Sequence, residues 1–199
     1  MPDSVGRHDH PAEVTVMTND AKTFREKLDA LIGAPMGPPS VAPDPVNQPM
    51  IRHWAAALED ANPVYTDPAF AAKTRFGGVV APPLMLQTWT MPTPQIRGIG
   101  ERGGSPVESG RNPLSVLDEA GFIATLATNS EFEIDRYLHL GETITSTTVL
   151  ESISDEKRTR VGLGHFVTWV TTFRDEKGES VGRQTFRIFK FKVDLGGAA

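Results

Sequence analysis

Four stretches in the second half of the chain decide its fold: residues 122–138 (FIATLATNSEFEIDRYL), 142–153 (ETITSTTVLESI), 158–173 (RTRVGLGHFVTWVTTF) and 179–193 (ESVGRQTFRIFKFKV). They are rich in Thr, Val, Ile and Phe, and many of their residues alternate between apolar and polar, as in Phe189-Lys-Phe-Lys-Val193. This two-residue period is typical of β-strands. Turn-like segments separate the stretches. We therefore expect an antiparallel meander of about four strands.

The distribution of proline supports this expectation. All 16 prolines lie between Pro2 and Pro113, and the remaining 86 residues have none. Proline cannot donate a hydrogen bond to a central β-ladder, so a long proline-free region suits paired strands.

The first half of the chain has a helical pattern instead. Residues 1–46 are predicted to form a mobile tail, a short helix at 20–32 and a proline-rich tether. Residues 47–199 are predicted to form a single domain. A helix begins near Pro49, which suits a first turn, and its buried stripe is predicted to consist of Ile51, Trp54, Ala55 and Leu58.

Two further segments of the first half bear on a binding site. Residues 82–91 are apolar nearly all round, which predicts a buried helix. Residues 92–112 are rich in Gly and Pro and are too long for an ordinary connection, so they are a candidate lid or pocket wall. A short helix is expected to follow, from Asn112-Pro113 to Ala120.

Composition excludes several classes of protein. The 199 residues carry a formal net charge of −5, which argues against non-specific nucleic-acid binding. The chain has no cysteine, so disulfides and thiolate chemistry are excluded, and we expect a reducing compartment, the cytoplasm. No apolar run approaches the length of a membrane span. The five histidines form no metal-binding pattern, and we predict no metal and no membrane contact.

One string of turn formers and small residues is the best candidate for chemistry. It runs from Asp60-Ala-Asn62-Pro63-Val-Tyr65 through Asp67-Pro68-Ala-Phe70 and continues to the glycines at 77 and 78 and the prolines at 82 and 83. Taken alone, the string favours a well-capped connection between two helices. The Gly178-Glu-Ser180-Val-Gly182 spacing of a nucleophile elbow is interpreted as chance, because a strand follows it where the elbow needs a helix.

The same string resembles the MaoC-like hydratase and dehydratase family, whose signature is Gly-Asp-x-Asn-Pro-x-His, then Asp-Pro, then His-Gly before a central helix. The match has no gap, and the resemblance extends from about Asn47 along the whole chain. It is closest to the larger subunit of two-subunit steroid side-chain enoyl-CoA hydratases, which often carry an additional domain. The resemblance implies an α+β hot-dog fold, in which an antiparallel sheet wraps a central helix and two such units pair into a double hot-dog.

The resemblance also implies a reaction, the addition of water to a 2-enoyl-CoA or its removal. An Asp/His pair activates the water, and a backbone N–H at the start of the central helix stabilises the enolate. In this chain the Asp falls on Asp60, but the His falls on Tyr65, which is a poor base near neutral pH. The oxyanion-binding Gly falls on Pro83, which has no N–H. Asp60, Asn62 and Tyr65 are therefore expected to form a degenerate site.

The leading hypothesis is a substrate-shaping, non-catalytic subunit of a heteromeric enoyl-CoA hydratase. Its partner would be a smaller MaoC-like subunit with an intact Asp/His pair, and its substrate a bulky acyl-CoA, with coenzyme A as part of the substrate and no other cofactor. Two alternatives stay open: an active homodimeric hydratase, and an acyl-CoA-binding protein without turnover. The predicted substrate-binding residues are Gly78, Val80, Ala81, Pro83, Met85 and Trp89.

Overall fold

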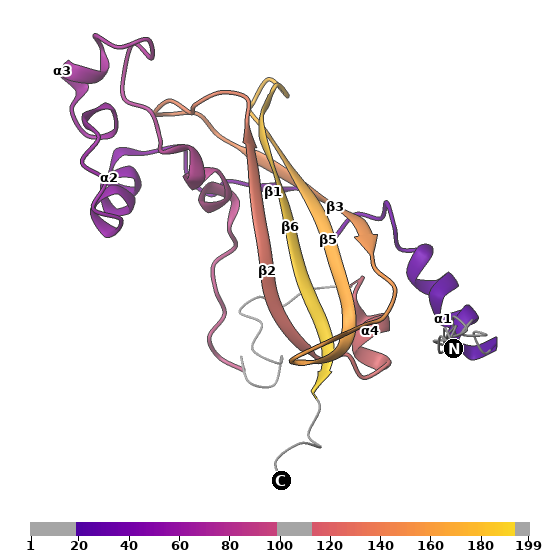
Figure 1. Cartoon of the computed structure of the whole chain (residues 1–199). Helices are drawn as coiled ribbons and strands as arrows, with labels where there is room; N and C mark the ends of the chain where they lie inside the picture. The colour runs from indigo at the N-terminus through magenta and orange to yellow at the C-terminus, as the bar shows by residue number, and fades with distance from the viewer. Residues whose placement is uncertain (1–18, 99–112, 194–199) are drawn as a thin grey trace, which may run out of the picture.

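The computed structural model describes residues 19–98 and 113–193. These residues form one antiparallel sheet with short helices (Figure 1). The strands are β1 (Ser40–Val41), β2 (Ala124–Ile134), β3 (Thr145–Ile153), β4 (Lys157–Thr159), β5 (Gly162–Arg174) and β6 (Ser180–Val193). The helical segments are α1 (Asn19–Asp29), α2 (Gln48–Ala57), η1 (Pro63–Tyr65), α3 (Pro68–Ala71), η2 (Pro83–Thr90) and α4 (Ser115–Glu119).

The four long strands are antiparallel as expected, but their order is not that of a meander. The sheet runs β1-β3-β5-β6-β2, so β2 pairs with the last strand and not with β3. The segment after β2 crosses the end of the sheet before β3 begins. Its backbone is tied there by the pairing of Val80 with His139 and by the Asp135 N–H, which bonds the carbonyl of Val181 at 3.2 Å. Consecutive pairing is confirmed for β3, β5 and β6, and only the expected pairing of β2 with β3 was wrong, because a crossing connection and not a hairpin follows β2.

The edge of the sheet at β3 is covered by the segment that precedes α2. β1 pairs with β3 through Ser40 and Val41. On one side of β1 the Gly33 N–H bonds the carbonyl of Leu150 at 2.8 Å, and on the other the Ala42 N–H bonds that of Ile144 at 2.8 Å. The proline-rich tether expected at residues 34–47 is therefore attached to the sheet along part of its length. The predicted domain boundary at 46 and 47 stays a prediction.

The segment expected to be a buried helix at 82–91 is helical, but it is the 3₁₀ helix η2. Two prolines open it, and they remove two of the backbone donors that an α-helix would present in its first turn. Met85, Leu86 and Trp89 are each at most 3% exposed and belong to a core cluster with Phe173 of β5 and Val181 of β6. This packing fixes η2 against the end of the sheet where β5 and β6 meet.

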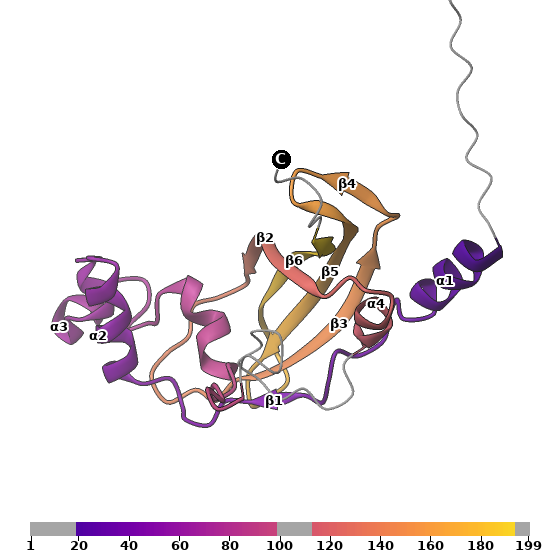
Figure 2. The ribbon, with the colours of Figure 1, turned by 90° about the horizontal axis from the view of Figure 1, so that it is seen from below.

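A second core cluster lies further along the same sheet and is covered by α1 and α4. Leu28 of α1 and Leu117 of α4 are fully buried there against Leu150 and Val167. Figure 2 shows the curl of the sheet. The inner face of the sheet thus has two covered ends.

The stripe predicted for α2 is only partly correct. Ile51 and Ala55 are buried and Trp54 is half-buried, but Leu58 is 61% exposed because the helix ends at Ala57. Asn47 caps this helix by accepting the Met50 N–H at 3.0 Å. The lobe of α2 and α3 stands beside the end of the sheet in Figure 1.

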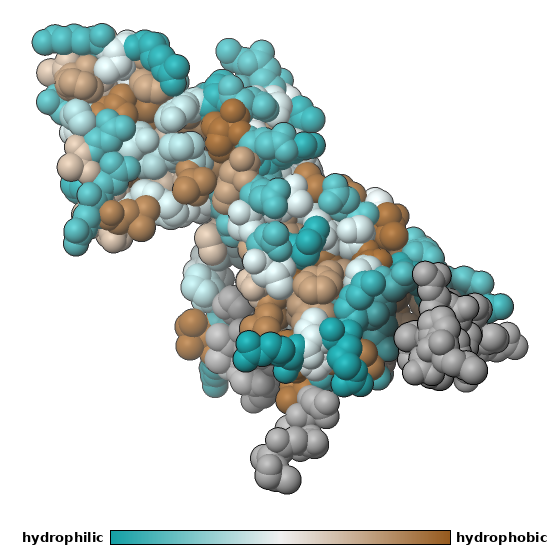
Figure 3. Space-filling model, in the orientation of Figure 1, coloured by the Kyte–Doolittle hydropathy of each residue, from teal (hydrophilic) through white to brown (hydrophobic). Residues whose placement is uncertain are grey.

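The outer face of the sheet, turned to the viewer in Figures 1 and 3, mixes hydrophilic and apolar residues. An exposed ion pair between Arg183 and Glu133, at 2.6 Å, belongs to it. None of the helices in the described ranges has the length and apolarity that crossing a membrane requires.

Candidate functional site

The segment from Asp60 to Tyr65 forms a capped turn, as its turn formers and capping residues predicted. Asp60 Oδ1 accepts the N–H of Asn62 at 3.0 Å, and Asn62 Oδ1 accepts the N–H of Val64 at 3.2 Å. Asn62 thereby caps η1. Asp60 is exposed and lines an open pocket of about 320 Å³ between α2 and this turn. Both side chains are therefore engaged with the local backbone.

Tyr65 lies behind this turn and is 7% exposed. Burial raises the pKa of its phenol above 10.0, and the charges of Tyr137 and Asp60 raise it further, while a hydrogen bond with Asn62 opposes the rise. The structure thus brings Asp60, Asn62 and Tyr65 together. A phenol whose pKa is above its ordinary value remains protonated near neutral pH and cannot accept a proton there.

The start of η2 has no N–H at its first two positions, because Pro82 is the N-cap residue and Pro83 the first helical residue. The Ala81 N–H just before them bonds the carbonyl of Leu138 at 2.8 Å. An oxyanion at this helix start would therefore find neither a donor at 82 and 83 nor a free donor at 81.

The predicted substrate-binding residues divide into two groups. Val80, Ala81, Met85 and Trp89 are each at most 3% exposed and belong to the core cluster around η2. Pro83 is half-buried and lines a pocket, and Gly78 is half-buried with open space where a side chain would extend. Their role in binding substrate stays a prediction.

A pocket of about 590 Å³ lies beside the start of η2 and the end of β2. It is lined by Arg75, Phe76, Pro83, Ile134, Asp135, Arg136, Tyr137 and His139. The rings of Phe76 and Tyr137 are 4.7 Å apart, and the Arg75 guanidinium lies 4.8 Å from the centre of the Phe76 ring. Asp60 does not line this pocket. The expected acid and this pocket are thus separate in this chain.

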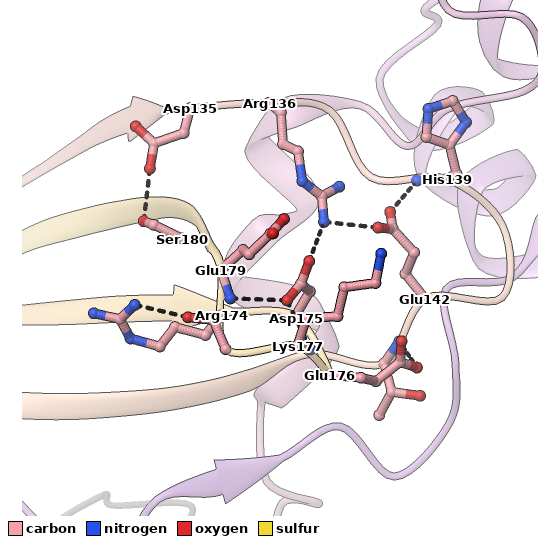
Figure 4. Close-up of polar contacts among 12 residues, drawn as sticks. Asp135, Arg136, His139, Glu142, Arg174, Asp175, Glu176, Lys177, Glu179 and Ser180 are labelled. Carbon is pink, nitrogen blue, oxygen red and sulfur yellow. Dashed lines mark hydrogen bonds and ion pairs between the residues drawn. The ribbon is translucent and has the colours of Figure 1, made fainter.

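One wall of this pocket is held by a network of charges, drawn in Figure 4. Arg136 Nη2 bonds Glu142 Oε1 at 2.7 Å and Asp175 Oδ2 at 2.8 Å. The hydrogen bond with Glu142 is the main reason that the pKa of Arg136 lies above its ordinary value. This arrangement fixes the guanidinium at the edge of the pocket.

Asp175 is the centre of the same network. Its Oδ1 accepts the backbone N–H groups of Lys177 and Glu179, each at 2.9 Å. Desolvation by itself raises the pKa of the carboxyl, but these N–H groups together with Arg136 lower it below its usual value. Asp175 therefore ties the β5–β6 turn to the segment after β2.

Sequence reasoning did not identify Arg75, Arg136, Tyr137 and His139 as pocket residues. Arg75 precedes the glycine pair in the motif string, and Arg136 lies near the end of the first predicted stretch, residues 122–138. Those positions mark ends of elements, where pocket residues often lie. A position at the end of an element is too common a feature to single out these four residues. Only the crossing of the segment after β2 brings them together.

Comparisons with known proteins give consistent matches. A family model described as "FAS1-like, dehydratase domain region" matches residues 30–184. The "Probable enoyl-CoA hydratase alpha subunit" of Thermomonospora curvata is 41% identical over 171 residues, which cover 85% of this chain and 52% of that protein. The "3-oxo-4,17-pregnadiene-20-carboxyl-CoA hydratase alpha subunit" of Mycobacterium tuberculosis is 37% identical over 170 residues, with the same two shares. The chain thus spans about half the length of the curated relatives it matches.

Solved structures agree with these matches. A chain in the crystal structure of the ChsH1-ChsH2 complex from Mycobacterium tuberculosis superposes with a TM-score of 0.72 at 34% identity. The match covers 87% of this chain and 98% of that one. A MaoC-like dehydratase superposes with a TM-score of 0.55 at 25% identity, over 84% of this chain and 44% of that one.

Proposed function

The chain belongs to the FAS1-like dehydratase family and has the MaoC-like hot-dog fold, and from this premise we propose that it is a substrate-shaping, non-catalytic subunit of a heteromeric enoyl-CoA hydratase. In this proposal the chain binds and positions a 2-enoyl-CoA. A smaller MaoC-like partner with an intact Asp/His pair activates the water. Coenzyme A enters as part of the substrate, and no separate cofactor is required.

The state of Tyr65 is the observation on which the non-catalytic role rests. Hydration requires a base that takes a proton from water near neutral pH. Tyr65 stands where related enzymes have the base, and burial raises the pKa of its phenol. The start of η2 supports the same proposal, because the loss of one oxyanion donor typically lowers the rate about 100- to 1000-fold. Both observations support a role in which Asp60 does not catalyse hydration by itself.

The outer edge of β2, which pairs with no other strand in the part of the chain that the structure describes, supports the proposal of a partner. β2 is the last strand in the sheet order, and most of its eleven residues are exposed. Leu126 of β2 is 44% exposed, and Ile123, just before the strand, is 68% exposed. A long edge strand with unpaired backbone groups is a template for a strand of another chain. We propose that the partner adds its own edge strand here, so that one sheet runs through both chains.

The acyl group is proposed to be bulky and ring-containing. The printed name of the Mycobacterium tuberculosis relative supports this choice, since it describes a pregnadiene-carboxyl-CoA hydratase subunit. In the assembled pair, the residues from Gly78 to Trp89 would form part of the wall around the acyl group.

A hydration assay tests the proposal. The purified chain is assayed with a 2-enoyl-CoA alone and after co-expression with a short MaoC-like chain that has an intact Asp-x-Asn-Pro-x-His motif. We expect activity only in the mixture, insensitive to Asp60→Asn and lost when the partner's motif histidine is replaced. Full activity of the chain alone, abolished by Asp60→Asn, would establish the active homodimer instead. Tight acyl-CoA binding without turnover in either sample would favour the binding protein.

A further inference from the structure

A buried amide on the inner face of the sheet joins three elements. Gln184 of β6 is 3% exposed, and its Nε2 donates to Gln87 Oε1 of η2 at 2.8 Å and to Ser130 Oγ of β2 at 2.8 Å. We call these three side chains the glutamine cluster. A side-chain amide nitrogen has two hydrogens, so both donors of Gln184 are used within the cluster.

The direction of these bonds determines what the cluster presents outward. Because the carbonyl oxygen of Gln87 accepts, its NH₂ group faces away from Gln184. Among the described residues no acceptor takes the amide hydrogens of Gln87. Ser130 likewise accepts through its oxygen, which leaves its own hydrogen free to donate. The cluster therefore offers donors, and its complement is an oxygen with free lone pairs.

The surroundings of the glutamine cluster are apolar. By the alternation of the strands, Phe132, Trp169 and Phe186 lie on the same face as Gln184. All three are half-buried, and the rings of Trp169 and Phe186 are 5.1 Å apart. The cluster lies between the core around η2 and the core around α1 and α4. Phe132 packs against the first core, and Phe186 packs against the second.

The cluster is also accessible from one side. Ser130 is exposed, and Gln87 is half-buried. Donors of this kind, placed on an apolar surface, fix the orientation of a mostly apolar ligand.

We infer that the glutamine cluster recognises a carbonyl oxygen of the acyl group, with Gln87 and Ser130 as specificity-determining residues. The inference rests on the proposed function, because it assumes that an acyl-CoA lies along this face. The oxygen belongs either to the thioester or to a ketone on the acyl group.

Binding of three unreactive thioesters distinguishes these sources. The probes are 4-oxocyclohexanecarbonyl-CoA, cyclohexanecarbonyl-CoA and butyryl-CoA, and the readout is calorimetric affinity for the full chain, with and without its partner subunit. The variants are Gln87→Met and Ser130→Ala. Ser152→Ala is the matched control, since it removes the same hydroxyl from an exposed position on the opposite face of the sheet.

We expect each cluster variant to weaken binding of the keto probe about 3- to 10-fold, the value of one net hydrogen bond. Unchanged binding of the other two probes identifies a ketone, and an equal loss for all three identifies the thioester oxygen. If all affinities stay unchanged, or fall equally in Ser152→Ala, the inference is overturned while the proposed function stands. An equal loss for all three probes that is accompanied by a lowered melting temperature also overturns it, because that combination indicates a purely structural role. Absence of binding by the unaltered chain in both samples overturns the proposed function itself.

Discussion

Replacement of Tyr65 by Phe tests whether this chain has a base of its own. The change removes one hydroxyl and keeps the ring in the core. Since burial raises the pKa of the phenol above 10.0, fewer than about one molecule in 1000 would carry phenolate at pH 7. A working general base contributes about 100- to 10,000-fold to the rate. We therefore expect the hydration rate of the assembled enzyme to stay within about 2-fold of the unaltered protein.

The assay follows loss of the conjugated thioester absorbance of a 2-enoyl-CoA between pH 6 and 10. Tyr137→Phe is the matched control, because Tyr65 and Tyr137 are the two tyrosines in the chain. Loss of the buried hydroxyl is expected to lower the free energy of unfolding by about 1 kcal/mol, so melting is measured in parallel. A fall of 100-fold or more in Tyr65→Phe alone, with no loss of stability beyond the expected value of about 1 kcal/mol, would refute the reasoning.

Three further predictions concern stability and assembly. Gly164→Ala places its Cβ 2.1 Å from a backbone carbonyl oxygen of β6, so we expect denaturant unfolding to show a loss of at least about 2 kcal/mol in the free energy of unfolding. Gly78→Ala, whose Cβ meets open space, should lower the free energy of unfolding by less than about 1 kcal/mol. Equal losses in the two variants would contradict this prediction. The pKa of Asp175 is lowered in the folded protein, so its contribution to folding stability is full above about pH 4, the unfolded value, and is lost as pH falls through the folded pKa. Asp175→Asn should therefore flatten the acid side of a curve of stability against pH. An unaltered acid side would argue against a stabilising role of the charge network around Asp175. Leu126→Glu should weaken association with the partner, measured by sedimentation, at least about 10-fold without lowering the melting temperature, because it adds a charge to the outer edge of β2. Val161→Glu, at a turn, is the control and should leave association unchanged. Equal association of both variants would exclude β2 as the interface.

Much of the fold follows from local patterns in the sequence. The alternating stretches after residue 121 correspond to β2, β3, β5 and β6, and α2 begins beside Pro49 as expected. The order of the strands could not be predicted in this way, because alternation assigns residues to faces but not strands to neighbours. The pairing of β2 with β6 depends on contacts between residues about 60 positions apart, such as Leu126 with Phe189.

The candidate site also contains a part that local sequence patterns predict and a part that they do not. The turn with Asp60, Asn62 and Tyr65 could be predicted because it is continuous in sequence and dense in capping residues. Arg136 and Gln184 could not, since each obtains its role from partners on other elements. Gln184 in particular has the sequence context of an ordinary strand residue, and only its distances to η2 and β2 distinguish it.

The hydrogen bonds between residues 33–42 and β3 limit how far the sheet of this chain can be extended. Among the described residues the edge of β3 is covered, whereas the outer edge of the long strand β2 pairs with no other strand. Pairing of two such chains through β2 would use this edge in both, so that a third strand could not add there. A sheet with two open edges would instead permit indefinite addition and fibrous aggregation. The short stretch before α2 thus blocks the addition of a further strand at the edge of β3.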